Sequence, residues 1–417
     1  GLQNVFGMTG MFVFPGILGA SLKLPIEQIA YLYGMTFICS GIITILQSVL
    51  LLRLPIAQGP YAGSFAALMA VSHIPQMGLA AAYGSFFVAS IIWAFMSVPI
   101  RGLSLVAAFA NLLRAPIISG LFVMLIMIQI ANVALPNWIG FRTSAGFPFV
   151  NLGAGAIAVV TIILVLVSGN FRLRRGGILL ALFTGTVCYA LFEPVSLNQV
   201  IHAPWFVEPK IFPWGFEVQP ELVIEFLLVL IPAGMGSLAL YQTVAEWGGE
   251  TLTPVRMSQG IFGVALGSIV AGIFGGFSTI VYPDNIGMLR ATRVGSRFAT
   301  LAAGIVLIVL GGCVKFDFLL VIVPLPVISA AATLLFGIVF MHSIHILSKV
   351  NWDERHLITG GMAFLVGLGG MFVSPDVMNA MPLMLRLILQ QPVVSGGVTL
   401  IILHALLCRN AEAKPAH

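Results

Sequence analysis

Long runs of apolar residues, separated by short polar connections, occur along almost the whole chain. A run of roughly 20 apolar residues is long enough to cross the hydrocarbon core of a bilayer. The first run carries no leading positive charge, so it is interpreted as a span rather than as a signal peptide. Full-length spans are predicted at residues 1–22, 28–52, 78–98, 115–134, 152–168, 177–192, 221–246, 255–275, 299–313, 318–341, 357–372 and 393–407.

Two apolar stretches depart from this pattern because a proline interrupts each of them. Residues 54–59 are strand-like, and Pro60 then precedes a short helix rich in small residues. Residues 277–282 are also strand-like, and Pro283 opens a second short helix over residues 283–289. One such break in each half of a membrane protein indicates the binding site of an inverted-repeat transporter. Two unrelated re-entrant turns are the alternative interpretation.

Composition excludes an ordinary soluble domain. Hydrophobic residues make up 59% of the 417 residues, charged residues make up 8%, and the mean hydropathy is +1.07. Fourteen of the 19 Lys and Arg residues fall in the loops on the side of the N-terminus. By the positive-inside rule this side is cytoplasmic, and an even number of spans places both termini there. The net charge of +5 therefore reflects membrane topology rather than nucleic-acid binding.

The sequence contains no motif for a cofactor. Its cysteines lie far apart in or beside apolar runs, which is typical of thiols packed in a core. No metal-ligand spacing, nucleotide motif or flavin motif occurs, and no nucleophile is paired with a base. The protein is therefore predicted to be no enzyme and to use no cofactor. The four cysteines are Cys39, Cys188, Cys313 and Cys408.

Polar and aromatic residues gather at the two breaks. Asp284 and Asn285 stand at the N-terminus of the second short helix, where free N–H groups and the helix dipole favour polar ligands. Tyr282 precedes Pro283, while Tyr61 and Phe65 follow Pro60, so the three rings are candidates for stacking on a flat ligand. Simple helix capping and core packing are the alternative roles.

The second break also carries a family motif. Asn285 and Gly287, followed by Thr292 and Arg293, match the spacing Asn-x-Gly-x-x-x-x-Thr-Arg. This motif resembles the signature of the nucleobase-ascorbate transporters, which include uracil and xanthine permeases. Asp284 occupies the first position, where the family has Gln, Glu or Pro. The resemblance thus identifies the chain as a divergent member.

Other segments extend the resemblance over the whole chain. Residues 54–65 resemble the third span of the family, residues 322–330 its twelfth, and residues 381–390 the region before its last span. The segment Ala-Glu-Trp-Gly-Gly-Glu places Glu246 where the family has a substrate-binding glutamate in the eighth span. Asn4 stands where the family usually has a histidine.

The resemblance implies an all-α polytopic fold. Fourteen transmembrane segments would form two inverted repeats of seven, with short strands before half-helices 3 and 10. A core domain would comprise residues 1–98 and 220–314, and a gate domain residues 99–219 and 315–417. The resemblance also implies a homodimer formed through the gate domain. It further implies location in a cell membrane, which would be the inner membrane in a bacterium.

The function implied is secondary transport of a purine or pyrimidine nucleobase by proton symport, with the core moving against the gate. Asp284, at a helix N-terminus, is expected to stay ionised and bind substrate. Glu246 has no helix N-terminus beside it and is expected to exchange protons. Both acids are candidates for proton coupling. The expected substrate-binding residues are Glu246, Asp284, Asn285, Tyr282, Tyr61, Ala62 and Phe65.

A different reading keeps the fold and changes the substrate. Two half-helix N-termini that face one site would also hold urate, a carboxylate or an inorganic anion. An uncoupled facilitator is a further variant. Two acids near the site argue against an anion unless they are protonated, and the sequence does not choose among the bases.

Overall fold

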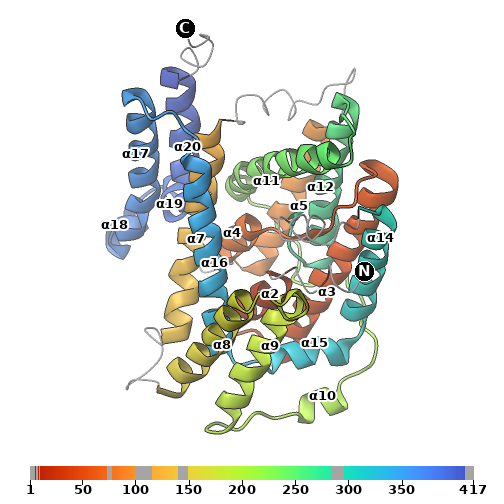
Figure 1. The fold of residues 1–417 in the computed structure, drawn as a ribbon. Coiled ribbons are helices and arrows are strands. Elements are labelled where there is room, and N and C mark those ends of the chain that lie inside the picture. The colour runs from red at the N-terminus through yellow and green to blue at the C-terminus, as the bar shows by residue number, and fades with distance from the viewer. Residues whose placement is uncertain are drawn as a thin grey trace.

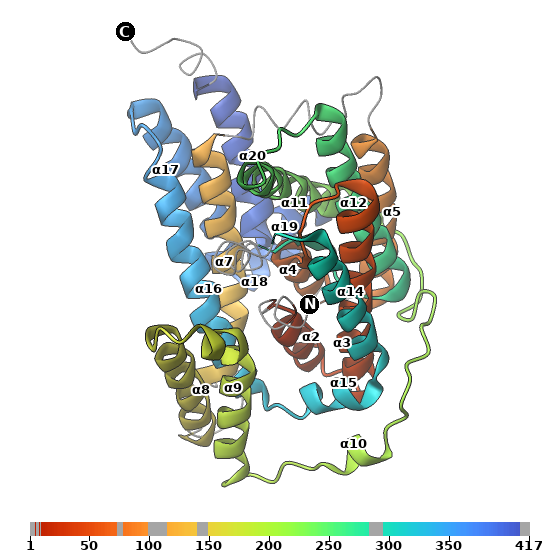
Figure 2. The same ribbon diagram turned by 45° about the vertical axis from the view of Figure 1, so that its right-hand side comes forward.

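The computed structural model describes residues 5, 8, 10–72, 78–98, 115–139, 149–282 and 295–408. Figure 1 shows a predominantly helical molecule in which two groups of helices stand side by side, and Figure 2 shows the same arrangement after rotation. Seven of the described helices are long and apolar enough to cross a membrane. The all-α polytopic fold predicted from the sequence is confirmed.

The first helix group surrounds a long helix near the N-terminus. This helix, α3 (Ile26–Ile45), continues without interruption into a π-helical turn, η1 (Leu46–Leu51). It packs closely against α14 because both helices have glycine at the contact: a Cβ atom on Gly41 would lie 2.6 Å from the carbonyl oxygen of Gly304. The other members are α2 (Gly10–Ser21), α4 (Ala62–Ser72), α5 (Leu79–Ser97), α11 (Pro220–Trp247), α12 (Pro254–Phe274) and α14 (Arg297–Gly312).

The second helix group contains the segments that lie to the left in Figure 1. Its central contact joins α7 and α16, and α8 and α9 form a hairpin beside them. One pair, α19 and α20, is bent by 95° at a short break and counts as at most one span. The members are α7 (Pro116–Ile139), α8 (Phe149–Val167), α9 (Phe171–Ala190), α16 (Leu325–Leu347), α17 (Glu354–Gly369), α18 (Pro375–Ala380), α19 (Leu383–Gln390) and α20 (Pro392–Leu403).

The predicted twelfth span differs from the structure at its start. The apolar run was expected to form one helix from Phe318, but a separate helix, α15 (Val314–Val321), ends before α16 begins at Leu325. Pro324 and Pro326 explain the break, because a proline disfavours the helical conformation in the residue before it. The predicted tenth short helix, residues 283–289, lies outside the residues that the structure describes.

The two predicted strands pair with each other at the centre of the molecule. Strand β1 (Gln58–Pro60) and strand β2 (Thr279–Val281) are antiparallel, with Gln58 opposite Val281 and Pro60 opposite Thr279. Both are shorter than the strand-like stretches in the sequence. Their pairing satisfies backbone groups that lipid leaves without partners. The two breaks therefore meet, and α4 follows the first of them as a short helix.

Candidate functional site

The two strands hold the tyrosines of the predicted site at opposite ends of a short ladder. Beyond the paired residues, the Tyr61 N–H donates to the Ser278 carbonyl at 2.6 Å, and the Tyr282 N–H donates to the Ala57 carbonyl at 3.1 Å. The backbone of each tyrosine is thus fixed by the opposite break.

Tyr282 connects the second break to the first helix. Its hydroxyl accepts a hydrogen bond of 3.0 Å from the Gly10 N–H, which opens α2 and has no acceptor within that helix. Its ring covers Gly59, where a Cβ atom would lie 2.5 Å from the ring atom Cδ2. Tyr282 is only 8% exposed. Gly59 is therefore required so that β1 and the ring can approach each other.

Tyr61, Ala62 and Phe65 have different surroundings, although they lie close together in sequence. The Tyr61 hydroxyl is buried and forms no hydrogen bond within the described parts of the chain. Ala62 is half-buried at the first position of α4. Phe65 is fully buried and stacks on Phe14 of α2 with ring centroids 4.7 Å apart. In this conformation Tyr61 thus has unused bonding capacity, whereas Phe65 belongs to the core.

Glu246 lies at the end of α11 and not beside the strands. Glu246 is exposed in the last turn of α11, whereas Gly236 is the α11 residue whose Cβ position faces Ile280 of β2 at 3.7 Å. Ten helical residues separate the two, which corresponds to about 15 Å along the helix axis. Asp284 and Asn285 lie outside the described residues. Gly236 was missed in the sequence because a glycine carries no chemical signal.

Buried polar groups on α3, η1, α11 and α12 form hydrogen bonds close to strand β1. The Gln58 N–H donates to Thr44 Oγ1 at 2.9 Å. Nearby, Gln47 Nε2 and the Tyr241 hydroxyl both donate to the Gly260 carbonyl, at 2.6 and 3.0 Å. π-helical turns such as η1 often occur at functional sites. Sequence reasoning missed this network because its members lie far apart in the chain.

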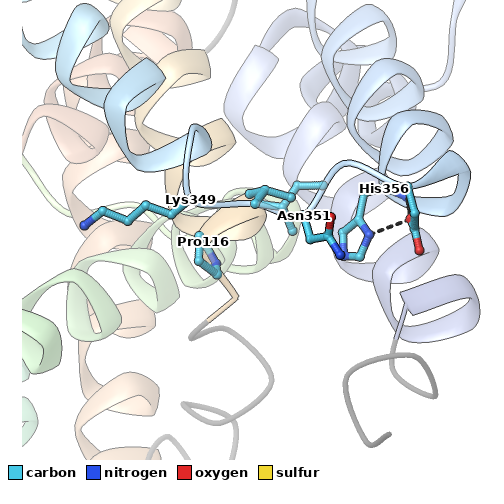
Figure 3. Close-up of a pocket in the computed structure, with 7 residues that line it drawn as sticks. Pro116, Lys349, Asn351 and His356 are labelled. Atoms are coloured by element: carbon cyan, nitrogen blue, oxygen red, sulfur yellow. Dashed lines mark hydrogen bonds and ion pairs between the residues drawn. The ribbon is translucent and has the colours of Figure 1, made fainter. Parts of the chain in front are cut away.

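A cavity of about 270 Å³ lies away from the strands, at the adjoining ends of α7, α16 and α17 (Figure 3). Asp353 caps α17, and its carboxylate accepts hydrogen bonds from the His356 N–H and, at 2.7 Å, from His356 Nδ1. These two hydrogen bonds hold the pKa of the Asp353 carboxyl below its usual range. The lining residues are Pro116, Ile117, Lys349, Val350, Asn351, Asp353 and His356.

Removing the Tyr282 hydroxyl is expected to affect stability more than removing the Tyr61 hydroxyl. Tyr282→Phe is expected to lower the free energy of unfolding by about 1–3 kcal/mol, because it leaves the buried Gly10 N–H without its acceptor. Tyr61→Phe, the matched control, removes a hydroxyl that has no partner and is expected to be nearly neutral. Thermal unfolding of the two purified variants in detergent measures the difference, and equal melting temperatures would contradict the capping role of Tyr282.

Seven long apolar helices and a pair of strand breaks packed against the first helix group define a polytopic membrane protein, whose fold is similar to that of solved membrane transporters. The transmembrane domain of the cyanobacterial bicarbonate transporter BicA is 14% identical, has a TM-score of 0.55 and aligns over 97% of both chains. Murine Slc26a9, an anion transporter in the inward-facing state, is 13% identical with a TM-score of 0.62, over 97% of this chain and 68% of its own. Both likenesses concern the fold alone.

The model of the Permease family, Xan_ur_permease, matches residues 1–375, and the chain belongs to this family. The resemblance seen in the sequence is thereby confirmed, and the protein is a multi-pass membrane permease rather than an enzyme. The nucleobase transporter PlUacP of Paenibacillus larvae is 27% identical over 97% of this chain and 93% of its own. The uric acid permease PucJ of Bacillus subtilis is 26% identical, over 97% and 90%, and the xanthine permease XanQ of Escherichia coli is 24% identical, over 94% and 86%.

Proposed function

We propose that this permease is a secondary transporter of a purine or pyrimidine nucleobase. The observation that carries the proposal is the antiparallel pairing of β1 and β2, which fixes Tyr61 and Tyr282 beside two short breaks in the membrane spans. In transporters of this architecture, substrate binds where such breaks meet. Relatives that align over nearly their whole length are named as transporters of nucleobases, uric acid and xanthine.

Recognition of the base rests on a small set of polar groups. Asp284 and Asn285 offer a carboxylate and an amide to the N–H and carbonyl groups of the base, and the free Tyr61 hydroxyl offers one further hydrogen bond. The Tyr282 ring and the start of α4 at Ala62 form apolar walls, and Phe65 supports this wall from the core. Glu246 contacts substrate only if the C-terminal end of α11 approaches the strands during the cycle.

Transport requires that the site open to each side of the membrane in turn. The first helix group corresponds to the proposed core, residues 1–98 and 220–314, and the second to the proposed gate, residues 99–219 and 315–417. We propose that the core moves against the gate like an elevator, that the gate forms the homodimer contact, and that both termini are cytoplasmic. The helices of each group pack mainly against one another, which supports this division.

Proton symport is the proposed source of energy, with Asp284 and Glu246 as the acids assigned from the sequence. An anion transporter on the same fold is the second candidate. One observation favours it: Glu246, the α11 acid assigned from the sequence, is exposed about 15 Å along the helix from Gly236, whose Cβ position faces Ile280 of β2. A site without an acid from α11 holds an anion more easily than a site with two carboxylates.

Uptake into proteoliposomes tests the proposed function. Radiolabelled uracil, xanthine, uric acid, bicarbonate and chloride are offered separately, with and without an inward proton gradient. The proposal predicts accumulation of at least one base, stimulated by the gradient and competed by unlabelled base. Transport of bicarbonate or chloride without any uptake of uracil or xanthine would replace it with the anion transporter.

A further inference from the structure

Glu225, on α11, is a buried acid that the sequence analysis did not single out. Its side chain is 3% exposed, and neither carboxylate oxygen has a hydrogen-bond partner among the described residues. An unpaired carboxylate in an apolar environment is strongly disfavoured. Acids inside membrane spans are rare and usually functional because they are costly.

The orientation of Glu225 follows from its neighbours on α11. Phe226 packs on Phe86 of α5, and Gly234 faces Trp93 of α5. At about 100° per residue, Glu225 points in nearly the opposite direction to Gly234 and in nearly the same direction as Gly236. Glu225 therefore lies on the stripe of α11 that faces β2, roughly 16 Å further toward the N-terminal end.

Helix α11 packs against members of both helix groups. Besides α5 and α12, helix α11 packs against α4 and β2, and against α7, α19 and α20 of the second group. On the described parts of these elements, α4, α7, α20 and β2 carry no titratable side chain, and α19 carries Arg386. Tyr83 lies on α5, while Arg256 of α12 pairs with Glu250 beyond the far end of α11. Arg386 is thus the titratable side chain on the described parts of the second-group helices that pack against α11.

We propose that Glu225 binds and releases the proton that drives transport. In the conformation described here Glu225 is buried, and its carboxyl retains the proton. When a conformational change admits water to the carboxyl, the O–H bond breaks and the proton passes to water, leaving a hydrated carboxylate. This inference rests on the proposed proton symport and assigns the coupling to Glu225 in place of the exposed Glu246.

The test compares Glu225→Gln with a matched variant of the same helix, Glu221→Gln, in proteoliposomes. Two readouts are taken for whichever base wild type transports: accumulation driven by a proton gradient, and exchange of labelled for unlabelled base at equal pH. Glu225→Gln is expected to keep exchange within about twofold of wild type and to lose gradient-driven accumulation. The control variant Glu221→Gln is expected to accumulate base as wild type does.

Different failures have different meanings. If wild type exchanges base but ignores the proton gradient, proton symport itself is wrong and the role of Glu225 falls with it. If wild type responds to the gradient and Glu225→Gln accumulates normally, only the assignment to Glu225 is overturned. Should Glu225→Gln fail to fold, Glu225→Asp keeps a carboxyl and is expected to retain coupling with a displaced pH profile; an unchanged profile would contradict the proposal.

Discussion

Asp284→Ala is expected to weaken binding of the base by roughly 10- to 150-fold while the protein remains folded. The reason is the loss of a charge-assisted hydrogen bond, which contributes about 1.5–3 kcal/mol. Asp284 follows Tyr282 by two residues, and the Tyr282 backbone is fixed to Ala57 of the other break. Equilibrium binding of labelled base to the purified protein measures the effect.

Asp376→Ala is the matched control for this prediction, because Asp376 is an exposed acid in the first turn of α18, far from the strands in the sequence. It is expected to bind base as wild type does. Comparable affinities for Asp284→Ala and wild type, with both proteins folded, would remove Asp284 from the site. An equal loss in both variants would indicate a general effect of charge instead.

Gly236→Trp is expected to abolish uptake. Gly236 is exposed, and its nearest neighbour in the described part of the chain is Ile280 of β2 at 3.7 Å. A large ring at this position would extend beside the strand and fill the space in which we place the base. Because nothing closer opposes the new side chain, the fold should survive, and uptake should fall at least about tenfold for a blocked site.

Gly361→Trp on α17 provides the control for the added bulk. Gly361 is also exposed, and no described atom lies within 4 Å of its Cβ position, but it belongs to the second helix group. Uptake by this variant is expected to equal that of wild type. If Gly236→Trp transports base at the wild-type rate, substrate does not pass in front of β2.

The strand breaks were predictable because proline, β-branched residues and small residues determine local conformation. Residues 54–59 and 277–282 were identified on that basis, and their pairing follows from the need for backbone partners in lipid. The start of α16 was missed because hydropathy is uniform across Val323 and Leu325, although Pro324 lies between them. Local signals therefore located the breaks, while hydropathy alone did not locate every helix end.

Tertiary relations in the candidate site were less accessible to sequence reasoning. Tyr61 and Tyr282 remain predicted members of one site, and the antiparallel register places their backbones at opposite ends of the ladder. Gly236 and Glu225 share one stripe of α11, and neither has a motif around it. Their relevance depends on which helices cover α11, and periodicity does not reveal this in a span that is apolar on all sides.

The central claim is that the base binds beside the meeting point of β1 and β2. Photolabelling tests this claim most directly. The protein is illuminated with a radiolabelled azido-purine, with and without excess unlabelled base, and the labelled peptides are identified by mass spectrometry. We predict competable label on the peptides that contain Tyr61 and Tyr282, and on the Gly236 face of α11. Competable label confined to the cavity lined by Pro116, Lys349 and His356 would contradict the account.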